Sequence, residues 1–104
     1  MKKSYTTDDL KVAIPKTLKM LLTATVGSLR SRMPKSKVAD IRFVLNHLVS
    51  IGLLKAALIP AETHTGLELV FYRIESSDEV EALYNYYYGQ SWVPYRLASM
   101  EEVT

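Results

Sequence analysis

The residues best suited to a chemical role are basic and polar side chains that cluster between positions 30 and 47. Lysine and arginine neutralise phosphate groups, and a serine hydroxyl beside a helix start can hold one more. Arg42 and Asn46 have the geometry to read guanine or adenine edges, because both side chains form paired hydrogen bonds with a base. The candidate contacts to DNA are Arg30, Arg32, Lys35, Ser36, Lys37, Arg42, Asn46 and His47.

Charge is distributed unevenly along the 104 residues. Residues 1–60 contain eleven Lys and Arg against three Asp and Glu, a net charge of +8, whereas residues 61–104 contain two against eight, a net charge of −6. A basic half of this kind favours a polyanionic partner, with the acidic half turned away from it.

The segment that must position the candidate contacts is residues 33–54. Pro34 predicts the end of an upstream helix, because a proline disfavours helical backbone in the residue before it. Ser36 is suited to cap the next helix, and Gly52 to end it before an extended run. Helical spacing predicts the buried face of this helix, which consists of Val38, Ile41, Leu45 and Leu48, widened by Val44 and Ile51.

Other parts of the chain predict the supporting elements. Thr6 and Thr7 before two aspartates indicate a helix start, and Pro15 is expected to end or kink that helix and to begin a second one. Residues 25–33 are expected to form a short amphipathic helix. Two strands joined by turn residues follow residue 53. Ser76 and Glu79 then form a capping-box pattern that predicts a last helix.

The order of these features resembles the helix-turn-helix of winged-helix regulators of the MarR and ArsR type. The sequences that carry the resemblance are TVGSLRSRM at 25–33 and ADIRFVLNHLVSIGLL at 39–54, and the resemblance covers about residues 12–76. It implies an α+β fold with a three-helix core and a β-hairpin wing, to which this chain adds a C-terminal helix. The expected single domain spans residues 1–104, with the helix-turn-helix at about 25–52, the wing at about 53–75 and a tyrosine-rich helix at about 77–89.

The expected wing departs from the family pattern. It carries Glu62, His64 and Glu68 near its tip, where many family members have arginine or lysine. This departure argues against contact between the wing and a DNA minor groove.

An aromatic cluster follows the expected wing. Tyrosine and tryptophan provide large contact areas with a polar group at one end, which suits a protein interface. The acidic surroundings disfavour the alternative, stacking on single-stranded bases. Because the resembled regulators dimerise through helices that flank the helix-turn-helix, we expect a homodimer interface formed by Tyr84, Tyr86, Tyr87, Tyr88 and Trp92.

Several function classes lack support in the sequence. There is no cysteine, no glycine-rich phosphate loop and no nucleophile motif, so we expect neither an enzyme nor a cofactor. His47 and His64 have no third partner at a metal-ligand spacing, and no metal site is predicted. No apolar run approaches the roughly 20 residues that span a bilayer, and the N-terminus lacks the apolar core of a signal peptide, so we expect a cytoplasmic protein.

Two interpretations of the function follow. The first is a homodimeric, sequence-specific double-stranded DNA-binding protein that regulates transcription. The alternative is a winged-helix module that binds a protein, such as a viral or plasmid factor acting on a host protein or polymerase complex, without contacting DNA. Asp40 and Phe43 favour the alternative, because an acid facing the groove would be repelled and an aromatic ring there would be buried elsewhere.

Overall fold

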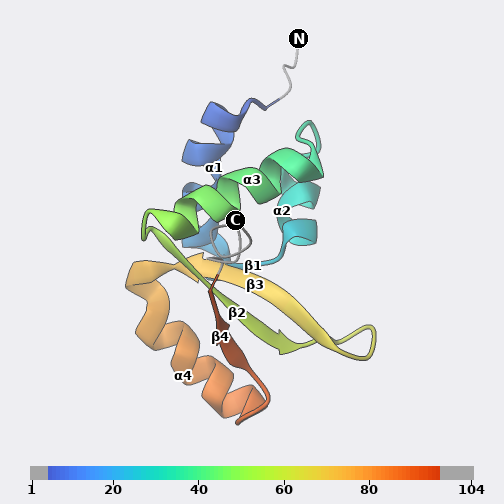
Figure 1. Cartoon of the computed structure of the whole chain (residues 1–104), viewed down its shortest axis with the longest axis vertical. Coiled ribbons are helices and arrows are strands. Elements are labelled where there is room, and N and C mark those ends of the chain that lie inside the picture. The colour runs from blue at the N-terminus through green and yellow to red at the C-terminus, as the bar shows by residue number, and fades with distance from the viewer. Residues whose placement is uncertain (1–4, 97–104) are drawn as a thin grey trace, which may run out of the picture.

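The computed structural model describes residues 5–96, which combine helices with one β-sheet (Figure 1). The described part of the chain contains four α-helices and a four-stranded antiparallel sheet, so the predicted α+β class is confirmed. The helices are α1 (Thr7–Leu21), α2 (Val26–Arg32), α3 (Val38–Ser50) and α4 (Ser77–Tyr88). The strands are β1 (Thr23–Ala24), β2 (Leu54–Pro60), β3 (Leu67–Arg73) and β4 (Val93–Tyr95), and a short 3-10 helix, η1 (Ile74–Ser76), precedes α4.

The sheet is built around a hairpin of β2 and β3. The two strands pair along their whole length, from Leu54 opposite Arg73 to Pro60 opposite Leu67. The strand order is β1-β3-β2-β4. This hairpin confirms the two strands predicted after residue 53, whereas the flanking strands β1 and β4 were not predicted.

Helices cover both faces of the sheet. In Figure 1, α1, α2 and α3 lie on one face and α4 lies on the other. The first face carries the main core, a cluster that includes Leu10, Ile14, Leu18, Leu29, Ile41, Leu45, Leu48 and Phe71. The opposite face carries the second core, which consists of Ala57, Val70, Tyr72, Val80 and Tyr84. Because neighbouring residues of a strand point to opposite faces, β3 contributes to both cores.

The first helix differs from the prediction. Thr6 caps α1 through a complete capping box with Asp9, as the sequence indicated. However, Pro15 neither ends this helix nor begins another, and a single helix continues through it to Leu21. The prediction of two helices was wrong. Leu10, Ile14 and Leu18 on both sides of the proline are fully buried in the main core, and this packing offsets the loss of one backbone hydrogen bond.

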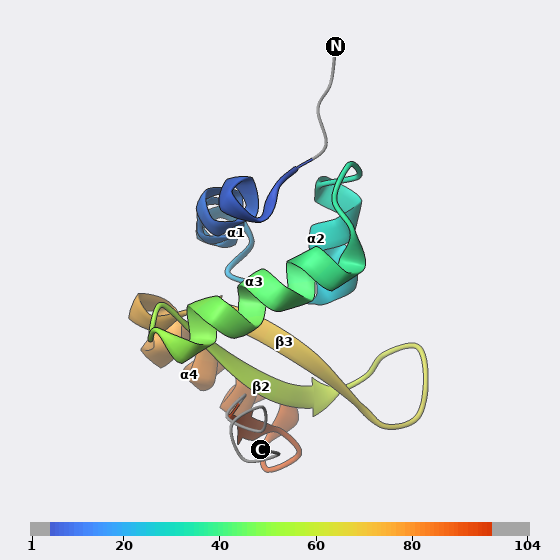
Figure 2. The ribbon, with the colours of Figure 1, turned by 45° about the horizontal axis from the view of Figure 1, so that its top comes forward.

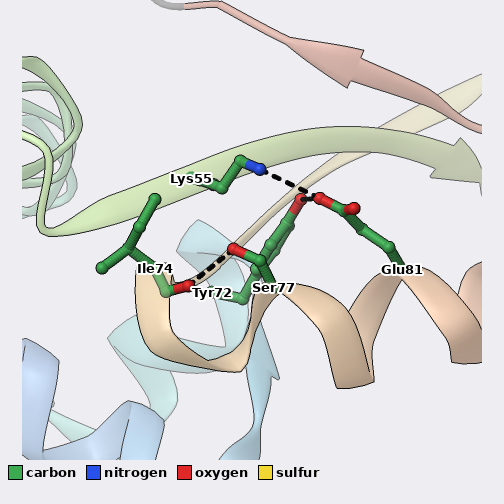
Figure 3. Close-up of polar contacts among 5 residues, drawn as sticks. All are labelled: Lys55, Tyr72, Ile74, Ser77 and Glu81. Carbon is green, nitrogen blue, oxygen red and sulfur yellow. Dashed lines mark hydrogen bonds and ion pairs between the residues drawn. The ribbon is translucent and has the colours of Figure 1, made fainter.

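The last helix begins where it was predicted but for a different reason. The side chain of Ser76 makes no capping hydrogen bond, so the predicted capping box was wrong. Instead, η1 leads directly into α4, and the Ser77 hydroxyl donates a hydrogen bond of 2.7 Å to the carbonyl of Ile74 (Figure 3). Gly89 ends the helix with a positive φ of 59°, which glycine adopts readily.

Candidate nucleic-acid interface

The turn between α2 and α3 is folded around Ser36. Its side chain is only 3% exposed, and its hydroxyl donates a hydrogen bond of 2.5 Å to the carbonyl of Met33. Lys37, not Ser36, occupies the cap position of α3, and it provides no side-chain cap. The prediction of Ser36 as a helix cap was therefore wrong, and we remove this buried residue from the candidate DNA contacts. Its role is to fix the shape of the turn.

Four basic side chains surround this turn and face solvent. Arg30 and Arg32 lie at the end of α2, and Lys35 and Lys37 lie in the turn itself, all of them exposed. None of the four forms an ion pair within residues 5–96, where the ion pairs are Lys11 with Asp8, Lys55 with Glu81 and Arg73 with Glu75. Their positive charges are thus available to a partner.

One side of α3 is buried and the opposite side is open. Ile41, Val44, Leu45 and Leu48 are at most 2% exposed, as the predicted stripe required. Val38 and Ile51 were predicted on the same stripe, but they are 41% and 54% exposed because they lie at the two ends of the helix. On the outer side, Arg42 and Phe43 are exposed and Asn46 and His47 are half-buried. Figure 2 shows α3 crossing in front of the hairpin.

A pocket of about 460 Å³ lies between α3 and the hairpin. Arg42 and Asn46 line one side of it, and Glu68 and Leu69 of β3 line another, together with Thr25 and the first residues of α2. The sequence did not predict this pocket. Glu68 and Leu69 are distant from α3 in the sequence, and it is the pairing of β3 with β2 that brings them to it. Glu68 and Arg42 thus contribute an acidic and a basic side chain to the lining of the same pocket.

The connection between β2 and β3 lacks basic residues. Glu62 and His64 are exposed there, and the turn is closed by a backbone hydrogen bond of 3.1 Å from Ala61 to Gly66. This geometry agrees with the acidic hairpin tip that the sequence predicted, and it leaves the basic charge on the α2–α3 side of the molecule.

The aromatic residues of the expected dimer interface divide into two groups. Tyr84 is 6% exposed, and its ring lies edge-on to Tyr72 and to Trp92, with centroid distances of 6.2 and 5.5 Å. Tyr88 and Trp92 are half-buried and pack against the second core. Tyr84 is therefore internal, and its assignment to a dimer interface was wrong, whereas Tyr88 and Trp92 keep part of their surface exposed. Tyr86 and Tyr87 remain 81% and 68% exposed.

Helix α4 is fixed to the sheet by a polar network as well as by the second core. Glu81 accepts a hydrogen bond of 3.0 Å from the Lys55 ammonium group and one of 3.3 Å from the Tyr72 hydroxyl (Figure 3). Burial and the neighbouring Glu81 carboxylate raise the pKa of Tyr72 well above its usual value. This network stabilises the fold, because Glu81 is the hydrogen-bond acceptor of both Lys55 and Tyr72.

Two further kinds of site find no support in the described residues. Within residues 5–96 no group of three or more His, Cys, Asp or Glu side chains is arranged to hold a metal ion. The helices of the same residues fall short of the length and apolar character that a membrane span requires.

Comparison with known proteins gives no assignment. The chain matches no protein-family model, no curated protein and no solved structure. The basis for a functional proposal is therefore the surface of the molecule itself.

Proposed function

We propose that this chain is a winged helix-turn-helix protein of the MarR and ArsR type that binds double-stranded DNA sequence-specifically and regulates transcription in the cytoplasm. In this proposal α2 and α3 form the helix-turn-helix, β2 and β3 form the wing, and α3 enters the major groove. The element order from α1 to β3 supports it, since three helices and a hairpin follow one another as that fold requires.

The observation that carries the proposal is the combination of an uncovered helix and unpaired positive charge. The outer side of α3 lies beside a turn with four exposed cations, none of which has an ion-pair partner within residues 5–96. Lysine and arginine in such a position neutralise phosphates and fix the register of a helix in the groove. Arg42 and Asn46, with His47 one helical turn after Phe43, would then face the bases.

We further propose that two copies associate through the exposed side of α4. Tyr86 and Tyr87 form an edge-to-face pair with a centroid distance of 5.0 Å, and Leu83 on the same side is 37% exposed. Helix positions three and four residues apart share one face, so these three residues form a continuous apolar strip. An exposed strip of this kind suits a protein contact.

One observation favours the alternative function, a module that binds a protein instead of DNA. Phe43 is 59% exposed at the centre of the outer side of α3, where a partner protein could bury it. The cluster of unpaired cations beside it favours DNA.

A mobility-shift titration with random-sequence duplex DNA at low salt tests the proposed function. We expect retardation at micromolar protein that weakens steeply as salt is added, because bound cations release counterions from the phosphates. A charge-neutral polymer and single-stranded DNA of the same length serve as competitors. Absence of any retarded duplex at low salt would lead to the alternative function.

A further inference from the structure

We propose that the outer side of α3 recognises the C5-methyl group of a pyrimidine in the major groove, and that Phe43 is the residue that contacts this methyl group. The inference rests on the proposed function, because it specifies which chemical feature of DNA the same surface reads. Phe43 becomes a specificity-determining residue.

Phe43 is an exposed aromatic residue on the outer side of α3. Its side chain is 59% exposed on a helix whose inner side is fully buried, and its ring meets no other aromatic ring within residues 5–96. Single exposed apolar side chains are ordinary on protein surfaces, but Phe43 shares the outer side of α3 with the exposed Arg42, so a partner that binds this side would also bury the ring.

The neighbours of Phe43 form a strip along the outer side of α3. An α-helix turns by about 100° per residue, so positions separated by three or four residues share a side. The strip therefore consists of Ala39, Arg42, Phe43 and Asn46, which lie opposite the buried Ile41, Leu45 and Leu48. It combines two apolar side chains, Ala39 and Phe43, with two side chains of the types that form paired hydrogen bonds with base edges, Arg42 and Asn46.

Asp40 does not interrupt this strip. It lies about 100° around the helix from Ala39, at the flank of the strip. It is half-buried there. It also belongs to the first turn of α3, where the positive end of the helix dipole favours a carboxylate. The acid that argued against DNA contact is thus explained by the helix itself.

The chemistry of the strip selects a methylated pyrimidine. In the major groove, thymine presents an O4 acceptor and a C5-methyl group where cytosine presents an N4 donor, and the methyl group makes apolar contacts with alanine or phenylalanine side chains. Arg42, next to Phe43, can at the same time donate hydrogen bonds to the O6 and N7 atoms of a neighbouring guanine. The exposed cations of the turn favour a polyanion as the partner that covers Phe43. A C5-methyl group occurs on thymine and on 5-methylcytosine, and both satisfy this contact.

The test compares duplexes that differ only in methyl groups. A random duplex pool is first enriched for binding to the full chain, and the enriched sequences are prepared with thymine or with deoxyuridine throughout. We expect the deoxyuridine duplex to bind about three- to fourfold more weakly for each contacted methyl, the size expected for one methyl group in an apolar contact. In a third preparation of the deoxyuridine duplex, 5-methylcytosine replaces cytosine, and recovery of affinity there identifies this base as a second source of the contact.

Phe43→Ala provides the matched comparison. This variant should bind the thymine and deoxyuridine duplexes equally, because it lacks the ring that distinguishes them. Met20→Ala on α1, which removes a side chain that is 74% exposed, should keep the full difference. Equal binding of both duplexes by the unmodified chain would overturn this inference and leave the proposed function intact. Failure to bind any duplex would overturn both.

Discussion

The hydroxyl of Tyr72 donates a hydrogen bond of 3.3 Å to the carboxylate of Glu81, which joins the centre of the sheet to α4. The Lys55 ammonium group meets the same carboxylate oxygen from β2 at 3.0 Å. One acidic side chain therefore satisfies a buried phenol and a partly exposed cation from two different strands.

We expect Glu81→Ala to lower the free energy of unfolding by about 1–3 kcal/mol, because the buried Tyr72 hydroxyl loses its acceptor. Urea denaturation followed by circular dichroism measures the effect. Glu79→Ala, on the exposed side of the same helix, controls for the loss of one acidic residue from α4. Equal stability of the two variants would contradict the proposed role of Glu81.

Alkaline pH should destabilise the fold. Burial raises the pKa of Tyr84 to about 12, although the nearby Thr23 side chain, which lies outside hydrogen-bond geometry, acts in the opposite direction. The unfolded tyrosine loses its proton near pH 10, so between about pH 10 and pH 12 the folded state binds more protons and stability falls as pH rises. The contribution of Tyr84 is intact below about pH 10.

Tyr84→Phe should remove up to about 1.4 kcal/mol per pH unit from this decline, the value for one proton. Denaturation measured from pH 8 to pH 11.5 provides the comparison. Tyr86→Phe is the control, because it removes the same hydroxyl from a side chain that is 81% exposed. If both variants decline alike, burial of Tyr84 is not the cause.

Leu45→Ala should cost about 2–5 kcal/mol, because Leu45 is 0% exposed at the point where α3 meets α1 and the sheet. A thermal melt detects a loss of this size, and Leu48→Ala should behave alike. Ile51→Ala removes a side chain of similar volume that is 54% exposed and should change little. A melt of Leu45→Ala that matches that of Ile51→Ala would exclude Leu45 from the core.

Much of the fold was predictable because local rules determine it. The four central residues of the α3 stripe, the proline after α2 and the alternation of β2 and β3 each depend on neighbouring residues, and all three were correctly located. The dimer-interface assignment of Tyr84 was not correct, because this side chain turns inward to meet β3, and its partners Val70 and Tyr72 come from another element. Sequence spacing alone does not say which tyrosine meets that surface.

Predictions that depended on a single polar side chain were less successful. Ser36 and Ser76 both have the composition of a helix cap, but neither makes that hydrogen bond. Ser36 instead folds the turn back onto Met33, and η1 precedes α4 where a cap was expected. Short hydroxyl side chains have several backbone partners within reach, and tertiary packing selects among them.

Lys35→Ala and Lys37→Ala should weaken binding to every duplex alike. If each protomer neutralises about three or four phosphates, a dimer gives a slope of log affinity against log salt near −0.9 times about six to eight. Each substitution should flatten this slope by about one unit for every phosphate that a protomer no longer neutralises. Lys19→Ala is the control. Lys19 is an exposed cation of α1 that lies near the acidic Glu75 and not in the turn, so its removal should leave the slope unchanged. An unchanged slope in the Lys35 and Lys37 variants would contradict contact between the turn and the phosphates.

Sedimentation, which measures oligomeric mass, tests whether the exposed strip of α4 joins two copies. Replacing Tyr86 and Tyr87 by serine is expected to lower the oligomeric mass without changing the melting temperature, because both side chains are exposed in one copy. Replacing Tyr84 and Tyr88 by serine should instead destabilise each copy through the second core. A monomeric unmodified chain at tens of micromolar would contradict the proposed dimer.

The pairing of β1 with β3 has a consequence for the order of synthesis. Thr23 and Ala24 pair only with Tyr72 and Phe71, which the ribosome adds long after α1, α2 and α3 are complete. Before that point a nascent chain carries three helices whose shared apolar side lacks Phe71, its cover from the sheet. Contacts between distant residues form slowly, and exposed apolar surface promotes aggregation. A chain interrupted before residue 71 should therefore be a substrate for chaperones or proteases and not a smaller working unit.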